Sequence, residues 1–397
     1  ARKLRADIKS RALIRKLINF NELRIFETAQ GQHNIVSLLR KGTGEEHARA
    51  CITTRTGQAT PEILSGILRW NDDETRYYEV AQPDLYDGSE SYIRLNRELV
   101  TIGVHKATIN SVLDKVAAHG ETLGKIANIN QGVVSGCDYV SNRNAENLPR
   151  GSDWELRDGI FVLDLENPRD NQVFASFPKG ERKLLRNFFK NTDIRMYRCK
   201  VEPTKKLIYY PAELDRSKFP HIYEHMLRFK GILKARLEQY NEHYHWTALH
   251  RPRNEDIFTV QKILVPYRSE ENAFAYNATE WFCRSDCYVI TQKHSAYALG
   301  YLLALLNSSL YFQWLFHRGK RKGKMLEMFQ IPLSEIPIKR MSPDEQKPFI
   351  KLVDRILAAK QRDAEADTSA LEREIDRLVY DLYGLTKEEI AIVEGKG

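Results

Sequence analysis

Apolar side chains at helical spacing open the chain. Between residues 2 and 20 they recur at intervals of three and four, which predicts an amphipathic helix. Two short apolar runs follow at 22–27 and 33–39, joined by the polar stretch 28–32, and this pattern predicts a β-hairpin. One helix and two strands cannot enclose a core, so residues 1–44 are predicted to be the end of an α/β domain that continues upstream.

Strand-like and helix-like patterns then alternate over most of the chain. A helix is predicted at 109–119, and from residue 121 short apolar runs predict strands at 159–165, 206–210, 262–266 and 287–290. Helical spacing predicts helices at 182–189, 223–240 and 296–316. This mixture predicts an α+β domain over residues 121–341, preceded by a connecting segment at 45–120.

Residues 342–397 are predicted to be helical. Ser342 can cap a helix whose first position suits Pro343. A second helix at 369–383 has its apolar side chains on one face and ends at Gly384, which can adopt the left-handed conformation of a helix end. Thr386, three residues before a glutamate, predicts one last capped turn.

Composition excludes several classes of protein. With 42% hydrophobic and 29% charged residues in 397, the chain can bury a core, so a disordered class is excluded. The five cysteines are odd in number and widely spread, which favours a reducing cytoplasm. Cys283 and Cys287 have no second pair at zinc spacing, so no metal site is predicted. No apolar run could span a bilayer, so we expect a soluble, cytoplasmic protein without a membrane partner.

The sequence contains none of four common kinds of catalytic or cofactor-binding motif, and it lacks the loop of amino-methylating enzymes. The tripeptide at 42–44 is Gly-Thr-Gly, but the third glycine of a dinucleotide-binding loop is missing. There is no phosphate-binding P-loop, zinc-protease helix or nucleophile elbow. No two prolines are adjacent, so the Asp/Asn-Pro-Pro-aromatic loop of amino-methylating enzymes is absent. No catalytic residue is therefore assigned.

Basic residues gather at particular places, and this clustering favours nucleic acid. The net charge is +8, and residues 179–206 alone hold ten basic and three acidic residues. Such concentrated charge can displace the counterions of a phosphate backbone, although a solvated helix face is the alternative. Residues 317–324 combine two glycines with five Lys or Arg side chains, which predicts a flexible loop. Arg318 or Arg321 in that loop could make a bidentate contact with guanine, whereas an ordinary mobile surface loop is the alternative.

Aromatic and arginine side chains occur together at two further places. Trp246 precedes Arg251 and Arg253, and Tyr267 and Arg268 follow the predicted strand at 262–266. These side chains suit stacking and forked hydrogen bonds, although a tryptophan is more often part of a core. The residues predicted to contact double-stranded DNA are Lys183, Arg186, Lys190, Arg195, Arg198, Trp246, Arg251, Arg253, Tyr267, Arg268, Arg318, Lys320, Arg321 and Lys322.

The order of several motifs resembles the TaqI-like specificity domain of adenine-N6 DNA methyltransferases. The first is Gly-Lys-Ile-Ala at 124–127 with Gln-Gly-Val-Val-Ser-Gly at 131–136. The others are the segment 193–197, Phe-Pro-His-Ile at 219–222, Trp246 before its arginine pair, the strand 261–266, Leu-Asn-Ser-Ser at 306–309, and the basic loop before 331–338. Residues 375–385 resemble the C-terminal helices of fused restriction-modification proteins. The resemblance covers about 220 residues.

The N-terminal residues resemble another part of the same enzymes. Residues 20–41 are similar to the last hairpin of the methyltransferase catalytic domain, where the family has an aromatic side chain that stacks on the flipped adenine. Phe26 occupies the matching position, although a core residue of the hairpin is the alternative. The resemblance thus implies the end of a Rossmann-like methyltransferase domain at 1–44, a mixed α/β DNA-recognition domain at 121–341, and C-terminal helices at 342–397.

The resemblance implies a function that this chain cannot perform alone. The family transfers a methyl group from S-adenosylmethionine to N6 of adenine. The glycines that bind the donor and the Pro-Pro loop are missing, so the cofactor is expected in the full-length protein and none in this chain. Two alternatives are a separate DNA-specificity or assembly subunit that recruits methyltransferase or nuclease partners, and a complete nuclease.

Overall fold

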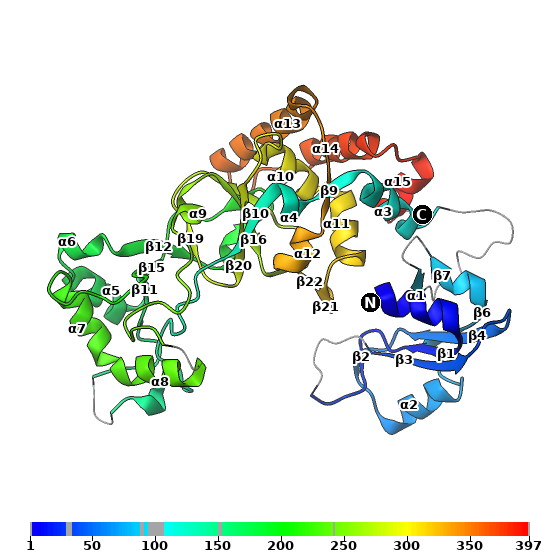
Figure 1. The fold of residues 1–397 in the computed structure, drawn as a ribbon, viewed down its shortest axis with the longest axis horizontal. Coiled ribbons are helices and arrows are strands. Elements are labelled where there is room, and N and C mark those ends of the chain that lie inside the picture. Colours follow the sequence, from blue (N-terminus) through cyan, green and yellow to red (C-terminus); the bar gives the residue numbers. More distant parts are fainter. Residues whose placement is uncertain are drawn as a thin grey trace.

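The computed structural model describes residues 2–28, 34–87, 91–93, 107–149, 153–240 and 243–395. The chain has a mixed α+β fold with several small sheets. In Figure 1 a sheet formed by the N-terminal residues lies at one end and a lobe of strands and helices lies at the other. A central sheet and the C-terminal helices occupy the region between them.

The N-terminal unit is a four-stranded sheet with one helix on each face. Its strand order is β3-β1-β4-β6, and its elements are α1 (Arg2–Arg11), β1 (Ala12–Asn19), β3 (Ile35–Lys41), β4 (His47–Thr53), α2 (Pro61–Leu68) and β6 (Thr75–Ala81). Ile8 of α1 packs with Ile14 and Leu17 on one face, and Ile67 of α2 packs with Ile18 on the other. Strands β4 and β6 come from residues 45–120, which the sequence predicted to be a connecting segment. The sheet therefore crosses the boundary predicted at residue 44.

The helix predicted at 2–20 is wrong in its second half. It ends at Arg11, and residues 12–19 form strand β1. Both faces of β1 are covered, so Leu13, Ile14, Leu17 and Ile18 are all buried. Two apolar pairs four residues apart satisfy a helical pattern equally well, and burial on both faces therefore concealed the strand.

The predicted hairpin is also wrong, because its two strands have other partners. Strand β3 pairs antiparallel with β1, whereas β2 (Leu23–Arg24) pairs in parallel with β5 (Gly57–Gln58). Residues 29–33, which include most of the predicted turn, lie outside the described residues. The next elements along the chain are η1 (Gln82–Leu85), β7 (Tyr86–Asp87) and β8 (Tyr92–Ile93), which pack against the N-terminal sheet. Helix α3 (Ile109–Ala118) packs in the central core and confirms the helix predicted at 109–119.

A second four-stranded sheet, in the order β10-β20-β16-β18, forms the centre of the molecule. Its strands are β10 (Ala127–Gln131), β16 (Lys262–Pro266), β18 (Ala275–Asn277) and β20 (Cys287–Gln292), and β16 and β20 confirm predicted strands. Helices α10 (Leu299–Asn307) and α11 (Ser309–His317) replace the single helix predicted at 296–316. The chain breaks at Ser308, whose hydroxyl caps α11.

The lobe contains a third four-stranded sheet, ordered β11-β15-β12-β19. Its elements are β11 (Val162–Asp164), α5 (Pro168–Ser176), α6 (Lys179–Arg182), β12 (Leu185–Phe189), β15 (Lys205–Ile208), α7 (Pro220–Arg228), α8 (Lys230–Tyr240) and β19 (Phe282–Cys283). Strands β11 and β15 confirm shorter forms of two predicted strands, and α7 with α8 divide the helix predicted at 223–240. The helix predicted at 182–189 is wrong, because Phe188 and Phe189 are buried in strand β12.

Short elements connect these sheets. They are β9 (Gly120–Thr122), α4 (Leu123–Ile126), η3 (Ala145–Asn147), η4 (Asn191–Asp193), β13 (Ile194–Arg195), β14 (Arg198–Cys199), α9 (Asp256–Thr259), β17 (Arg268–Ser269), β21 (Arg321–Lys322), β22 (Met325–Glu327), α12 (Gln330–Ser334) and β23 (Pro337–Lys339). Strand β23 pairs with β9, so the chain returns to the start of the central region before the last helices begin.

The C-terminal helices are α13 (Pro343–Arg362), α14 (Ser369–Leu382) and α15 (Lys387–Val393). The starts of all three and the end of α14 confirm the prediction. Ser342 and Thr386 both form capping boxes, and Gly384 has φ +59°. Asp376 of α14 accepts hydrogen bonds from the backbone and hydroxyl of Ser309, at 2.8 and 2.6 Å, so α14 is fixed to α11. Among the described residues, no helix is long and apolar enough to cross a membrane.

A buried histidine makes the stability of the lobe depend on pH. His225 of α7 lies between the rings of Phe177 and Phe229, and its Nε2 is 3.0 Å from the carbonyl of Ile160. Burial lowers its pKa to about 4, and the charge of Arg228 adds to this effect, although the Ile160 carbonyl and Asp158 oppose it. The fold therefore holds His225 neutral at a pH where the unfolded chain binds a proton.

We expect the contribution of His225 to the free energy of unfolding to be fully present above pH 6.5. This contribution, up to about 3 kcal/mol, should be lost as the pH falls from 6.5 toward 4. Urea unfolding at pH 7.5 and pH 5 measures the change. In His225→Gln, the difference in the free energy of unfolding between pH 7.5 and pH 5 should be smaller by most of that amount. An unchanged difference would show that other groups are responsible.

Candidate nucleic-acid interface

The loop at residues 132–139 connects the central sheet to the lobe, and backbone hydrogen bonds fix it on both sides. The amide of Val133 donates to the carbonyl of Cys283 at 2.7 Å. Val134 and Arg251 exchange two backbone hydrogen bonds, at 2.8 and 3.0 Å. The loop therefore lies between two segments that are more than a hundred residues away in the sequence.

Two glycines allow this close packing. A Cβ on Gly132 would lie 2.2 Å from the carbonyl oxygen of Arg284 and 2.5 Å from that of Cys283. Gly136 has φ +81°, and a Cβ there would lie 2.6 Å from the side chain of Arg236. The Gln-Gly-Val-Val-Ser-Gly motif of the sequence thus corresponds to a loop that only glycine at these positions can form.

A buried arginine supports the loop from inside the lobe. Arg236 of α8 is 4% exposed, and its guanidinium donates to the carbonyls of Ser135, Trp246 and Ala248 at 2.6, 3.1 and 2.8 Å. One cation thus joins the 132–139 loop to residues 246–248. Buried carbonyls need such partners, so Arg236 fixes the relative position of the two segments.

The end of the loop presents an ion pair at the surface. The Nε of Arg284 lies 3.0 Å from Oδ2 of Asp138, and the side chain of Arg284 is 48% exposed. A cavity of about 430 Å³ lies beside this pair, with Tyr139, Lys190 and Arg157 also in its wall. A second hollow of about 310 Å³ shares Asp138, Tyr139 and Arg284.

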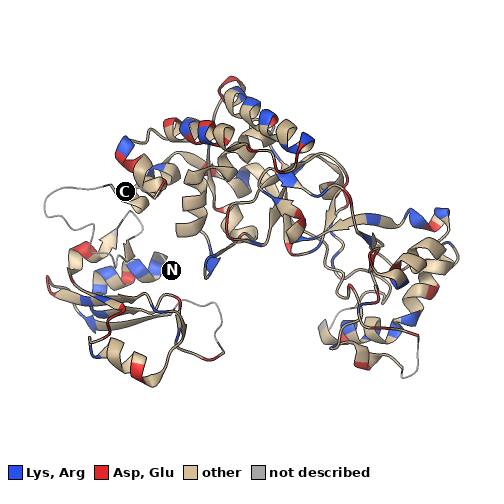
Figure 2. Ribbon diagram, turned by 180° about the vertical axis from the view of Figure 1, so that it is seen from behind, with Lys and Arg blue, Asp and Glu red and all other residues tan. Residues whose placement is uncertain are grey.

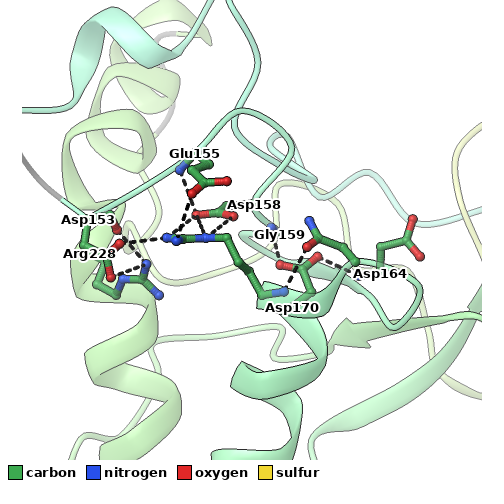
Figure 3. Close-up of polar contacts among 9 residues, drawn as sticks. Asp153, Glu155, Asp158, Gly159, Asp164, Asp170 and Arg228 are labelled. Carbon is green, nitrogen blue, oxygen red and sulfur yellow. Dashed lines mark hydrogen bonds and ion pairs between the residues drawn. The ribbon is translucent and has the colours of Figure 1, made fainter.

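A network of carboxylates holds the wall of the larger cavity (Figure 3). Arg169 of α5 makes ion pairs with Asp153, Glu155 and Asp158, at 2.8, 3.2 and 3.0 Å. Asp170 accepts hydrogen bonds from the backbone amides of Gly159 and Asp164, both at 2.8 Å. Burial raises the pKa of Asp170, although these two amides oppose the shift. The network fixes residues 153–170 in one arrangement.

About half of the predicted contact residues have exposed side chains. These are Lys183, Lys190, Arg195, Arg251, Lys320, Arg321 and Lys322. Lys190 lines the larger cavity, and Arg251 is the residue whose backbone pairs with Val134. Figure 2 shows basic positions on the N-terminal unit as well as on the lobe. Of the exposed predicted residues, Lys183 and Lys190 lie beside strand β12 of the lobe, whereas Lys320, Arg321 and Lys322 lie in or beside β21, so the structure does not bring all of them to one place (Figure 1).

Other predicted residues have partners inside the protein. The ion pairs are Arg186 with Glu255 at 2.7 Å, Arg198 with Glu365 at 3.4 Å, Arg268 with Glu327 at 2.7 Å, and Arg318 with Asp114 at 2.9 Å. Arg253 donates to Gln131 at 2.9 Å, Trp246 is 7% exposed, and Tyr267 is half-buried. These contacts stabilise the fold, and they engage groups that the sequence suggested for DNA.

The basic loop predicted at 317–324 is a short hairpin. Strands β21 and β22 pair with each other, and β22 also pairs with β17. Gly323, at the turn, has φ +61°. The guanidinium of Arg321 lies 3.8 Å from the centre of the Phe316 ring, while the side chain of Arg318 is only 6% exposed. The hairpin therefore exposes Arg321 and Lys322 and holds Arg318 inside.

Comparison with known proteins identifies the central part of the chain. Residues 188–338 match the family model of the TaqI-like C-terminal specificity domain. Over these residues the chain is similar to that specificity domain. The match begins in β12 and ends in β23, so the specificity domain includes most of the central sheet and the β21–β22 hairpin. It lies within the segment 121–341 that the sequence predicted, and it confirms the resemblance to the specificity domain of a restriction-modification methyltransferase.

Two curated relatives are type II methyltransferases. The chain is 24% identical to M.MjaIV of Methanocaldococcus jannaschii over 72% of this chain and 89% of that protein. It is 26% identical to M.HindII of Haemophilus influenzae over 55% of this chain and 38% of the relative. Among solved structures, the type IIL restriction-modification enzyme MmeI in complex with DNA matches with a TM-score of 0.54 at 12% identity, over 96% of this chain and 45% of MmeI. The chain thus spans less than half the length of M.HindII and MmeI.

Sequence reasoning missed the residues that build the 132–139 loop. Asp138 and Arg284 each belong to a segment without a run of basic residues, so a search for such runs passes over them. Arg236 lies in helix α8 with Lys230 and Lys234, and nothing in the sequence distinguishes it from these as the buried one. The available signal was the spacing of Gly132 and Gly136, which indicates close backbone approach. Within the part of the chain that the structure describes, no group of His, Cys, Asp and Glu side chains could hold a metal ion.

Proposed function

We propose that this chain recognises a short sequence in double-stranded DNA, as the target-recognition part of an adenine-N6 methyltransferase of a restriction-modification system. The match of residues 188–338 to the specificity domain carries this proposal. The rigid 132–139 loop and the exposed cations beside it supply the two kinds of group that such a module needs. Cations bind phosphates and position the protein, while side chains on rigid loops contact the bases.

The N-terminal unit is proposed to be the end of a Rossmann-like catalytic domain. Its sheet has a helix on each face, as in that fold, and its edge strand β3 exposes Ile35, Val36, Leu38 and Leu39. An apolar edge strand is suited to pairing with a further strand. Phe26 is 56% exposed, so its ring is accessible for stacking on an extrahelical adenine.

The methyl donor, S-adenosylmethionine, would be bound by the rest of the enzyme. The described residues include no glycine-rich donor loop and no Pro-Pro loop, so we expect no methyl transfer by this chain alone. Cytoplasmic DNA is the expected substrate of the whole enzyme.

A separate specificity subunit is the second candidate. M.MjaIV, itself named a type II methyltransferase, is matched over 89% of its length, so a protein of about this extent occurs as a separate chain. The reading frame upstream of Ala1 distinguishes the candidates. A continuous frame with a Pro-Pro-aromatic loop supports the fused enzyme, and a start codon close to Ala1 supports the subunit.

A salt series tests DNA binding itself. We expect the logarithm of the affinity for mixed-sequence duplex DNA to fall linearly with the logarithm of salt concentration, because each phosphate contact releases counterions. A slope of about −4 or steeper would correspond to the several exposed cations. The double variant Lys190→Gln with Arg195→Gln should make the slope shallower by about 1 to 2. A slope near zero for the unmodified chain would contradict the proposal.

A further inference from the structure

Arg284 stands on the wall between the two hollows beside the 132–139 loop. It lines both the cavity of about 430 Å³ and the hollow of about 310 Å³. Its side chain is 48% exposed, whereas its partner Asp138 is 12% exposed. The carboxylate thus lies on the inner side of the pair, and the guanidinium extends toward solvent.

Both members of this pair are fixed by their backbones. The carbonyl of Asp138 accepts hydrogen bonds from the amides of Ile160 and Val162, at 2.8 and 3.1 Å. The amide of Arg284 donates to the carbonyl of Phe189 at 3.0 Å, and its own carbonyl accepts from Cys287 at 3.0 Å. The positions of both Cα atoms are therefore set by β11, β12 and β20.

The carboxylate of Asp138 is also fixed. Its Oδ1 accepts a hydrogen bond from the hydroxyl of Ser135, and its Oδ2 meets Arg284. Ser135 is in turn held by the buried Arg236, through the Ser135 carbonyl. A continuous set of contacts thus connects the interior of the lobe to the exposed guanidinium, and little side-chain freedom remains to be lost on binding.

The part of the guanidinium that faces away from Asp138 suits a base with two acceptors. Asp138 lies nearest to Nε, and neither η nitrogen donates a hydrogen bond to any residue that the structure describes. Two parallel N–H donors match N7 and O6 of guanine in the major groove. By contrast, Arg268 uses both Nε and one η nitrogen on Glu327, and Arg186 does the same on Glu255.

We propose that Arg284, oriented by Asp138, contacts the major-groove edge of one guanine and determines that position of the recognised sequence. This inference rests on the proposed function. A backbone phosphate offers similar acceptors, so the test must separate a base contact from a phosphate contact. A base contact affects one position of the sequence, whereas a phosphate contact affects all sequences equally.

The test is a selection from a random pool of duplex DNA with the full chain and three variants. Arg284→Gln removes the forked donor, and Ser135→Ala removes the support of the carboxylate. Arg143→Gln is the matched control, because Arg143 is exposed and belongs to the wall of neither hollow. Bound duplexes are sequenced, and the salt dependence of binding is measured for each protein.

In Arg284→Gln we expect the preference for one G·C pair to fall roughly 5- to 100-fold, with the other positions and the salt slope unchanged. Ser135→Ala should lower the same preference to a smaller extent, and it provides the test if Arg284→Gln does not fold. Uniformly weaker binding with a slope shallower by about 1 would assign Arg284 to a phosphate and overturn the inference. An unchanged motif in both variants would also overturn it. If the unmodified chain selects no motif, the proposed function itself fails.

Discussion

Replacing Gly132 by alanine is expected to destabilise the lobe and abolish sequence-specific DNA binding. The new methyl group would lie 2.2 Å from the carbonyl oxygen of Arg284 and 2.5 Å from that of Cys283. Both are backbone atoms in segments that β12 and β20 hold, so neither can move aside at low cost. We expect the free energy of unfolding to fall by about 3 kcal/mol or more, measured by urea denaturation.

Gly180→Ala is the matched control for this change. A Cβ on Gly180 has no heavy atom within 4 Å, so the same substitution there meets open space. We expect its unfolding midpoint to stay within the range of ordinary surface substitutions. If Gly132→Ala were as stable as Gly180→Ala, the close approach of the loop to residues 283–284 would be wrong.

Replacing Arg236 by methionine is the second change with a large expected effect. Methionine preserves much of the side-chain volume but leaves the carbonyls of Ser135, Trp246 and Ala248 without their donor. Unsatisfied buried acceptors are costly, and we expect the free energy of unfolding to fall by about 3 kcal/mol. The 132–139 loop should also loosen, so DNA binding should weaken at a temperature where the variant remains folded.

Lys234→Met on the same helix controls for the loss of a basic residue. Lys234 is exposed, so its removal changes the charge of the chain without unpairing a buried carbonyl. We expect near-normal stability for this variant. Faster amide hydrogen exchange at residues 133–138 in Arg236→Met, and not in Lys234→Met, would confirm that Arg236 fixes the loop. Equal exchange in both variants would contradict that role.

The sequence predicts the parts of the fold that local chemistry determines. Ser342, Thr386 and Gly384 mark helix ends through side-chain capping and a left-handed turn, and these ends lie where expected. Strand β16 was predicted with its bounds, because a short apolar run that includes β-branched residues and ends at a proline is typical of a buried strand. Such signals depend on neighbouring residues only.

The sequence does not predict elements whose burial depends on distant partners. Strand β1 has a helical pattern because both of its faces are covered. Strand β12 has one because Arg186 and Asn187 place Leu185 at helical spacing from Phe188 and Phe189. Strand β3 pairs with β1, while β2 pairs with β5, a strand more than thirty residues further along the chain. Tertiary packing decides these elements.

The same limit applies to the candidate site. The sequence identified Lys190 by basic clustering and Arg251 by its place after Trp246, and the structure places both at the 132–139 loop. It also identified Arg186 and Arg318, whose guanidinium groups are engaged by Glu255 and Asp114. An arginine next to a carboxylate can be recognised only when both positions are known, because the two residues are far apart in the chain.

The most direct test of sequence recognition compares two duplexes at one salt concentration. One carries the sequence that the chain selects from a random pool, and the other has the same composition in scrambled order. We expect the selected duplex to bind about 1,000-fold more tightly or better, which is the lower end for specific DNA-binding proteins. Equal affinity for the two duplexes, whatever its strength, would contradict the proposal that this chain determines the specificity of a methyltransferase.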